Sequence, residues 1–302
     1  MPTIKSRQET LRPLERAQEY LELCKPKVVA LMVFTSLVGM LLAAPGAVPL
    51  RVLLLGNLGI ALVAGAAAAI NHLADRHIDS IMARTRARPL PTGQLDPLRV
   101  VVFATLIGAL GMWILIAYIN VLTAVLTLLS LVGYAIVYTL FLKRATPQNI
   151  VIGGAAGAMP PLLGWTAVSG QVDPNALLLF LIIYTWTPPH FWALALYRKE
   201  EYAKVDIPML PVTHGDDFTR LHILLYTILL VLITIMPYLT GMSGAIYLVG
   251  ALALGGIFIY RAVLLLRTRD SEVAIKTFVY SIVYLMALFA FLLFDRYLPL
   301  ML

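Results

Sequence analysis

The chain has 302 residues, of which 60% are hydrophobic and only 13% are charged, whereas an ordinary soluble domain carries about 25% charged residues. This composition excludes a soluble globular domain and indicates a polytopic membrane protein. The single cysteine, Cys24, excludes an internal disulfide framework and a cysteine-rich metal centre.

Nine apolar stretches recur along the chain, each close to the length of about 20 residues that crosses a bilayer. They cover approximately residues 28–44, 50–70, 98–119, 122–142, 150–168, 176–196, 221–240, 245–266 and 277–294. We therefore expect an all-α fold: a bundle of about nine transmembrane helices around a central cavity. Residues 1–27 would form an amino-terminal segment, and residues 28–302 a single membrane domain with cap loops at 71–97 and 197–218.

The basic residues are strongly asymmetric about these stretches. All of them except Arg51 and Arg296 fall on one side, which by the positive-inside rule is the cytoplasm. We expect a cytoplasmic amino terminus and a carboxyl terminus outside. The net charge of +7 is explained by this bias, so a nucleic-acid partner is not implied.

The first residues do not have the pattern of a targeting peptide. Their acids, Glu9, Glu15, Glu19 and Glu22, argue against both a signal peptide and a mitochondrial transit peptide. The bacterial inner membrane is therefore the favoured location, with the mitochondrial inner membrane as an alternative. Residues from about Glu9 to Leu23 are typical of an amphipathic helix at the membrane surface, or of a partly disordered tail.

The first cap loop opens with oxygen ligands at helical spacing. Asn71, Asp75 and Asp79 are four residues apart, so in a helix they line one face. Magnesium usually takes only one or two protein carboxylates and completes its shell with water and substrate phosphate. These three residues therefore predict a magnesium-diphosphate site. The alternative is that they are helix-end residues paired with Arg76, Arg84 or Arg86.

Two arginines four apart follow this run. The guanidinium of arginine donates parallel hydrogen bonds to phosphate and stays protonated, so Arg84 and Arg88 are predicted to hold the diphosphate. The competing explanation, positive-inside topology alone, accounts well for Arg86.

The second cap loop is expected to begin inside the membrane, where Pro188 and Pro189 unlock the helix beside His190. A histidine at that depth needs a partner, so His190 is predicted to bind a metal, act as acid or base, or orient a carboxylate. The mixed charges that follow would either complete the diphosphate site or be solvated. His72 and His77 flank the aspartates and are weaker candidates for a substrate contact.

The pattern of these segments resembles that of the UbiA-type intramembrane prenyltransferases, and within them the branch that farnesylates heme. The segments are Asn71 to Asp79, Arg84-Thr-Arg-Ala-Arg-Pro-Leu-Pro-Thr-Gly93, Pro189-His190-Phe191, Glu200-Glu-Tyr202 and Ile207-Pro-Met-Leu-Pro211. The resemblance extends over nearly the whole chain. The aspartate run is typical of the whole superfamily, whereas Pro189-His190-Phe191 and the segment from Ile207 to Pro211 point to the heme branch.

The resemblance implies a nine-helix fold and a reaction that joins farnesyl diphosphate to heme B, giving heme O and free diphosphate. It assigns Mg²⁺ to Asn71, Asp75 and Asp79. Many relatives carry a second pair of aspartates, and alignment places Arg198 and Tyr202 at those positions. This difference leaves the number of metal ions open and implies that cations, including Lys199, help to hold the diphosphate.

In the mechanism that the resemblance implies, the allylic farnesyl cation is attacked by the vinyl group at carbon 2 of heme B and water then adds. His190 would ligate the heme iron, contact a propionate or manage the water. Two alternatives compete: a family member that prenylates a quinone precursor, and a polytopic transporter. Whether a heme A synthase or an oxidase assembly factor is a physical partner stays open.

Overall fold

A computed structural model describes residues 13–298, and all its regular elements within that range are helical. In this described part of the chain, nine helices are long and apolar enough to cross a membrane: Pro26–Ala43 (α3), Leu50–Ile81 (α4), Pro97–Tyr118 (α5), Val121–Ala145 (α6, η1 and α7), Asn149–Ser169 (α8), Pro174–Tyr197 (α9), Asp216–Leu239 (α12), Ala245–Thr268 (α13) and Ser271–Tyr297 (α14). The chain is thus a multi-pass membrane protein, as its composition predicts.

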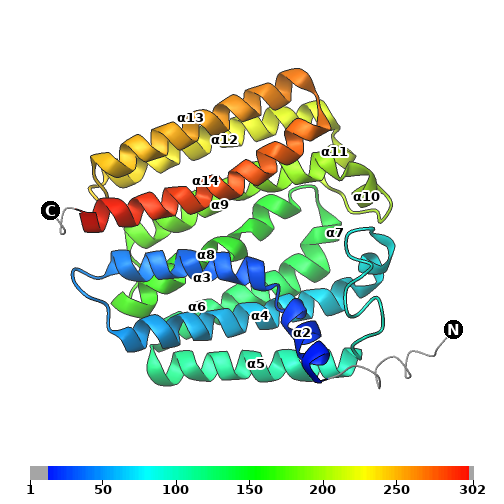
Figure 1. The fold of residues 1–302 in the computed structure, drawn as a ribbon, viewed down its shortest axis with the longest axis horizontal. Coiled ribbons are helices and arrows are strands. Elements are labelled where there is room, and N and C mark those ends of the chain that lie inside the picture. The colour runs from blue at the N-terminus through cyan, green and yellow to red at the C-terminus, as the bar shows by residue number, and fades with distance from the viewer. Residues whose placement is uncertain (1–12, 299–302) are drawn as a thin grey trace.

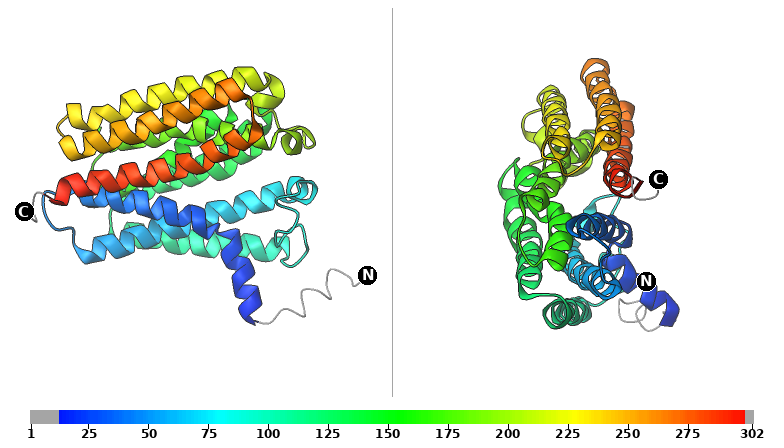
Figure 2. Two further views of the ribbon diagram at one scale, coloured as in Figure 1. Left: turned by 45° about the horizontal axis from the view of Figure 1, so that its top comes forward. Right: turned by 90° about the vertical axis from the view of Figure 1, so that its left-hand side faces the viewer.

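The nine helices lie roughly parallel or antiparallel and form two groups (Figures 1 and 2). In the first group α3 packs against α4 and α8, and α4 packs against α5. In the second group α9 contacts α12 and α14, and α13 joins these last two. The groups meet where α8 packs against α9 and α3 against α14.

The interface between α3 and α8 depends on glycine. A Cβ atom at Gly164 of α8 would meet the backbone carbonyl of Ser36, and one at Gly39 of α3 would meet that of Pro161. Small residues let helix backbones approach closely where lipid offers no hydrophobic driving force. This contact fixes α3 against α8 within the first group of helices.

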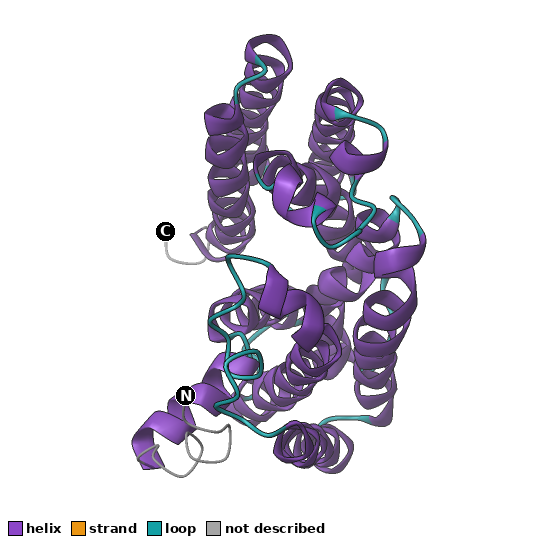
Figure 3. Ribbon diagram, turned by 90° about the vertical axis from the view of Figure 1, so that its right-hand side faces the viewer, coloured by secondary structure: helices purple, strands orange, loops and turns teal. Residues whose placement is uncertain are grey.

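Several of the connections between helices lie together at one end of the bundle (Figure 3). We call residues 82–96 the first cap and residues 198–215 the second cap; the latter contains the short helices Lys199–Ala203 (α10) and Leu210–Thr213 (α11). Helix Pro13–Leu23 (α2) lies at the same end, at an angle to α3 (Figure 1). The predicted amphipathic helix therefore exists from Pro13 onward, and its first residues, 9–12, lie outside the described residues.

Two expected boundaries are corrected by the helices. The segment 71–97 is not a loop throughout, because α4 continues to Ile81 and carries the aspartates on its last turns. Pro188 and Pro189 do not interrupt α9, which runs on to Tyr197. Both prolines are buried among neighbouring helices, and membrane helices tolerate proline where packing re-satisfies the backbone.

The fourth span departs from the expected regular helix. Its first half, Val121–Val132 (α6), is α-helical, but Gly133–Leu142 (η1) is a π-helix and the short helix Lys143–Ala145 (α7) follows. π-helical turns are uncommon and often occur at functional sites. Here the π-helix contacts the polar end of α4.

Candidate functional site

The polar end of α4 presents three buried side chains on one face. Asn71, Asp75 and Asp79 are each 4% exposed, and Asn71 Nδ2 donates a hydrogen bond of 2.9 Å to Asp75 Oδ2. The spacing of four residues puts them one above another, as the sequence predicts. Two carboxylates buried in a membrane helix are costly unless cations compensate them.

Three cations from three separate segments provide that compensation. Lys143 Nζ lies 2.7 Å from Asp75 Oδ2, and Arg88 Nη1 lies 2.7 Å from Asp79 Oδ2. Lys25 Nζ, at the junction of α2 and α3, donates to Asn71 Oδ1 at 2.7 Å. The aspartates thus pair with Arg88 and Lys143, and not with Arg76, Arg84 or Arg86 as the alternative explanation supposed.

The π-helix supplies two further contacts to this face. Asn71 Nδ2 donates to Thr139 Oγ1 at 3.2 Å, and Lys25 Nζ donates to the hydroxyl of Tyr134 at 3.2 Å. Thr139 in turn donates to the carbonyl of Tyr134 at 2.8 Å. These bonds tie the fourth span to α4 at the level of the aspartates.

The chemistry of these side chains fits a magnesium ion. The face offers two carboxylates and one amide oxygen, and the recorded ion pairs use only the Oδ2 atom of each aspartate. Within residues 13–298, no group of three or more histidine, cysteine, aspartate or glutamate side chains is placed to hold a metal alone. The site therefore suits an ion that keeps water and substrate phosphate oxygens in its shell.

Arginine side chains extend the positive field over this face. Burial, followed by the charge of Arg88, lowers the pKa of Lys25 to about 8, while Asp75 and Asp79 act in the opposite direction. Arg84 is exposed on the first cap, and its charge acts on Lys25 and also on Tyr202 of the second cap. Arg84 and Arg88, the two arginines predicted to hold the diphosphate, therefore lie within electrostatic reach of the aspartate face.

The two caps meet through apolar packing. Tyr202, 4% exposed, belongs to a buried cluster that also contains Ile78 of α4, Met82 of the first cap, and Ile207 and Met209 of the second cap. Burial raises the pKa of the Tyr202 hydroxyl, and Arg84 and Arg198 counteract this rise. The isoleucine-proline-methionine motif thus has a packing role that brings the second cap onto α4.

Arg198 and Lys199 of the second cap have acidic partners of their own. Arg198 Nη1 lies 2.5 Å from Glu201 Oε1, and Lys199 Nζ lies 2.8 Å from Asp216 Oδ1. These ion pairs stay within the second cap and the start of α12. The prediction that Arg198, Lys199 and Tyr202 contact diphosphate stays a prediction.

The histidines of α4 face different surroundings. His77 is exposed, whereas His72 is 2% exposed and neither of its ring nitrogens has a hydrogen-bond partner. His72 lines a cavity of about 370 Å³ together with Lys25, Arg88 and residues of α2. An unpartnered buried imidazole is uncommon in a folded protein, so His72 is the better placed of the two for a substrate contact.

His190 lies on α9, and it contacts side chains of both α9 and α14. Its Nδ1 is 2.6 Å from Ser281 Oγ, and its ring stacks on Trp186 and Phe278 with centroid separations of 4.1 and 4.5 Å. The structure records no contact between His190 and the aspartate face among the described residues. His190 therefore has the partner that its depth requires, and its predicted catalytic role is untested.

Sequence reasoning missed four residues of the site: Lys25, Tyr134, Thr139 and Lys143. The two lysines are at the ends of apolar stretches, where they look like ordinary positive-inside charges. Tyr134 and Thr139 look like ordinary residues of a span. The signal that could have found the lysines is electrostatic, since two aspartates at the end of a span demand cations from neighbouring helices.

Comparison with known proteins identifies the family. The UbiA prenyltransferase family matches residues 32–293, so the chain belongs to that family. A protoheme IX farnesyltransferase of Marinobacter nauticus is 67% identical over 280 residues, covering 93% of this chain and 93% of that protein. A protoheme IX farnesyltransferase of Teredinibacter turnerae is 63% identical over 93% of this chain and 90% of that protein.

Solved structures show the same fold. A digeranylgeranylglyceryl phosphate synthase superposes with a TM-score of 0.77 at 22% identity, covering 92% of this chain and 98% of that chain. A UbiA homologue from Archaeoglobus fulgidus bound to DMAPP and Mg²⁺ superposes with a TM-score of 0.61 at 18% identity, covering 91% and 99%. The predicted UbiA-type bundle is thereby confirmed.

Proposed function

We propose that this protein converts heme B to heme O by transferring a farnesyl group from farnesyl diphosphate. The observation that carries the proposal is the buried Asn71, Asp75 and Asp79 face with cations from three segments around it. The 67% identity to a protoheme IX farnesyltransferase supports heme as the acceptor. The reaction would supply heme O for heme A synthesis and terminal oxidases.

Asn71, Asp75 and Asp79 would hold Mg²⁺, which when bound offsets charge that develops on the diphosphate as its bond to carbon breaks. A family member of known structure binds Mg²⁺ together with a prenyl diphosphate, in keeping with this assignment. Arg84 and Arg88 would donate hydrogen bonds to diphosphate oxygens, with Arg198, Lys199 and Tyr202 completing the site from the second cap. Such preorganised donors typically account for about 10²- to 10³-fold in rate each.

The carbon chemistry then follows from charge balance. The carbon–oxygen bond of farnesyl diphosphate breaks and its electron pair leaves with the diphosphate, giving an allylic cation. The vinyl π electrons at carbon 2 of heme B form the new carbon–carbon bond, and water adds to the resulting cation and loses a proton. Apolar helices around the reactants exclude water from the first cation.

The acceptor would lie near the histidines. His72 lines the cavity beside Lys25 and Arg88, so its free ring nitrogens would meet a heme propionate or the iron there. His190, with Nδ1 engaged by Ser281, would contact the macrocycle from α9, and His77 is a weaker candidate. In this arrangement the site opens toward the cytoplasm of a bacterium, where farnesyl diphosphate is available. The carboxyl terminus then lies on the opposite side of the inner membrane.

The test is a reconstitution of purified protein with heme B, farnesyl diphosphate and Mg²⁺, followed by mass spectrometry of the heme product and a diphosphate assay. Heme O formation is expected, with loss of about 10²-fold or more in rate for Asp75→Asn and Asp75→Ala. Glu272→Gln removes one exposed carboxylate elsewhere and should leave the rate unchanged. If no farnesylated heme forms, the proposal is wrong. If the protein instead prenylates 4-hydroxybenzoate supplied in place of heme B, it acts on a quinone precursor.

A further inference from the structure

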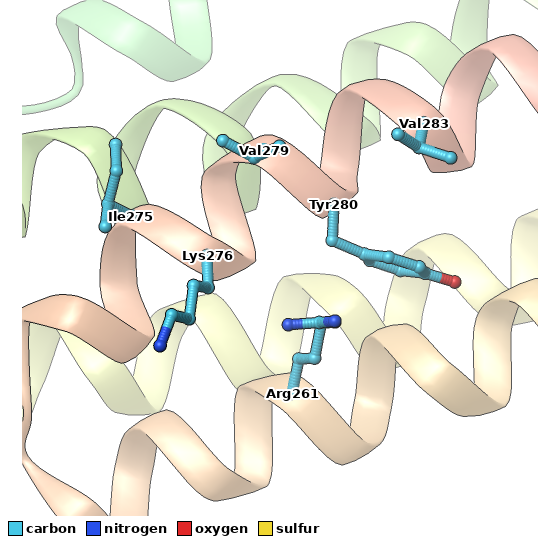
Figure 4. Close-up of a pocket in the computed structure, with 6 residues that line it drawn as sticks. All are labelled: Arg261, Ile275, Lys276, Val279, Tyr280 and Val283. Carbon is cyan, nitrogen blue, oxygen red and sulfur yellow. The ribbon is translucent and has the colours of Figure 1, made fainter.

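A groove outside the prenyl-transfer site lies between the last two helices, on the outer surface of the bundle. It has a volume of about 380 Å³ and is lined by Arg261 of α13 and by five residues of α14, Ile275, Lys276, Val279, Tyr280 and Val283. Figure 4 shows Arg261 and Lys276 reaching into the space between the two helices. Nothing in the proposed reaction uses this groove.

The two cations of the groove have no acidic partner among the residues that the structure describes. The Arg261 guanidinium lies 4.9 Å from the centroid of the Tyr280 ring, and its Nε is buried without a hydrogen-bond partner. Glu272 precedes Lys276 by four residues, yet they form no recorded ion pair. A cation on the membrane-facing side of a helix is costly without an anion, so the groove calls for a negatively charged ligand.

The depth of these cations matches lipid headgroups. Arg261 lies seven residues before the end of α13 at Thr268, and Lys276 lies five residues after the start of α14 at Ser271. At a rise of about 1.5 Å per residue these positions are about 10 Å and 8 Å from the helix ends. Helices of 24 and 27 residues extend beyond a hydrocarbon core of about 30 Å by about 3 Å and 5 Å at each end. The backbone of Lys276 therefore lies about 3 Å inside the boundary and that of Arg261 about 7 Å inside it, depths from which long basic side chains reach the headgroups.

Apolar side chains continue the groove toward the membrane centre. Val279 and Val283 are 53% and 54% exposed and follow Lys276 along the same face of α14. The Tyr280 hydroxyl donates inward to the carbonyl of Leu254 at 2.7 Å, which leaves its ring as the floor under Arg261. The groove therefore combines a cationic end with an apolar wall of the kind that an acyl chain covers.

We propose that the Arg261–Lys276 groove is a binding site for an anionic phospholipid. The phosphodiester would pair with the guanidinium and the ammonium group, and one acyl chain would lie along Val279 and Val283. Basic pockets between membrane helices bind anionic headgroups in this manner. A zwitterionic lipid has the same acyl chains, but the positive charge of its headgroup weakens the attraction between its phosphate and the two basic side chains.

The test uses purified full-length protein in zwitterionic detergent, titrated with phosphatidylglycerol or phosphatidylcholine and followed by native mass spectrometry and thermal unfolding. Wild-type protein is expected to prefer phosphatidylglycerol by about 30-fold. Arg261→Gln with Lys276→Gln should abolish this preference. A matched control, Arg267→Gln with Arg99→Gln, removes two exposed cations outside the groove and should keep it.

Each arm of the experiment decides the proposal. The proposal is wrong if the Arg261→Gln, Lys276→Gln variant still prefers phosphatidylglycerol, or if wild-type protein shows no such preference. Because the double variant could fail to fold, Lys276→Gln alone, at an exposed position, should reduce the preference about fivefold. Inorganic phosphate at the same phosphate concentration should not displace phosphatidylglycerol, and displacement would show that the groove binds free anions instead. Formation of dimers through the groove face would also contradict lipid binding.

Discussion

Lys143 Nζ and Asp75 Oδ2 lie 2.7 Å apart although 68 positions separate them in the chain. The Lys143 side chain is 13% exposed and that of Asp75 is 5% exposed, so the pair is largely removed from water. A buried carboxylate that loses its partner costs several kcal/mol. The pair therefore holds the end of the fourth span against the aspartate face.

We expect Lys143→Gln to lower stability by roughly 3 kcal/mol, because Asp75 is then left uncompensated. Thermal unfolding in detergent should show this decrease, and added Mg²⁺ should restore more stability to the variant than to wild type. Arg144→Gln, at the exposed neighbouring position, is the control and should change little. Equal effects of the two substitutions would show that the Lys143–Asp75 ion pair does not contribute to stability.

Arg88 is predicted to need its planar guanidinium. Its Nη1 already pairs with Asp79, and the remaining donors are available for diphosphate; lysine offers a point charge without this fork. Arg88→Lys should therefore raise KM for farnesyl diphosphate about 10- to 100-fold, the loss of one hydrogen bond to a charged group. Arg86 is exposed on the same cap, so Arg86→Lys is the control and should leave steady-state kinetics unchanged. An unchanged KM in Arg88→Lys would show that Arg88 does not contact the diphosphate.

Local sequence patterns predicted much of this arrangement and missed what depends on tertiary contact. The i, i+4 spacing of Asn71, Asp75 and Asp79 is a property of one helix, so their shared face could be predicted. Lys25 reaches that face from the residue before the first span, and Lys143 reaches it from the end of the fourth span. Their contribution depends on helix packing, which no single segment encodes.

Irregular helix geometry was equally hidden. Gly133–Leu142 has the composition of an ordinary apolar span, but its contacts to Asn71 and Lys25 accompany a π-helix. Conversely, the paired prolines at 188 and 189 favour a break that does not occur, because a surrounding bundle stabilises the helix beyond its local preference. The aspartate face was therefore predictable, and its cationic and hydroxyl partners were not.

Lys25 should make substrate binding depend on pH. The pKa of this lysine, about 8, is below its ordinary value because burial disfavours the charged form. The unfolded chain thus binds more protons above pH 8, so the stability cost of Lys25 is present below pH 8 and is relieved as pH rises. The charge available to diphosphate is lost over the same range.

We therefore expect KM for farnesyl diphosphate to rise above pH 8 in wild-type protein, measured at saturating Mg²⁺. In Lys25→Arg the cation stays charged, so the pH profile should be flatter. Lys27→Arg is the control because Lys27 is exposed, and it should reproduce the wild-type profile. Identical profiles for all three proteins would exclude Lys25 as a diphosphate contact.

The α3–α8 crossing gives a prediction independent of chemistry. Gly164→Ala would force a methyl group against the Ser36 carbonyl, and overpacking of this kind costs about 1–3 kcal/mol. Gly157→Ala on the same helix has no atom within 4 Å of the added carbon and should be neutral. Thermal unfolding of both variants checks this, and equal stabilities would show that the helices can separate without penalty.

His190 offers the last test, because its contacts support two different roles. Stacking between Trp186 and Phe278 and the bond to Ser281 would by themselves make it a packing residue. As a contact to the acceptor, His190→Gln should raise KM for heme B about tenfold and leave KM for farnesyl diphosphate unchanged, since the aspartate face is separate. His214→Gln, at an exposed turn position, is the matched control. A lowered unfolding temperature with both KM values unchanged would show that His190 only joins α9 to α14.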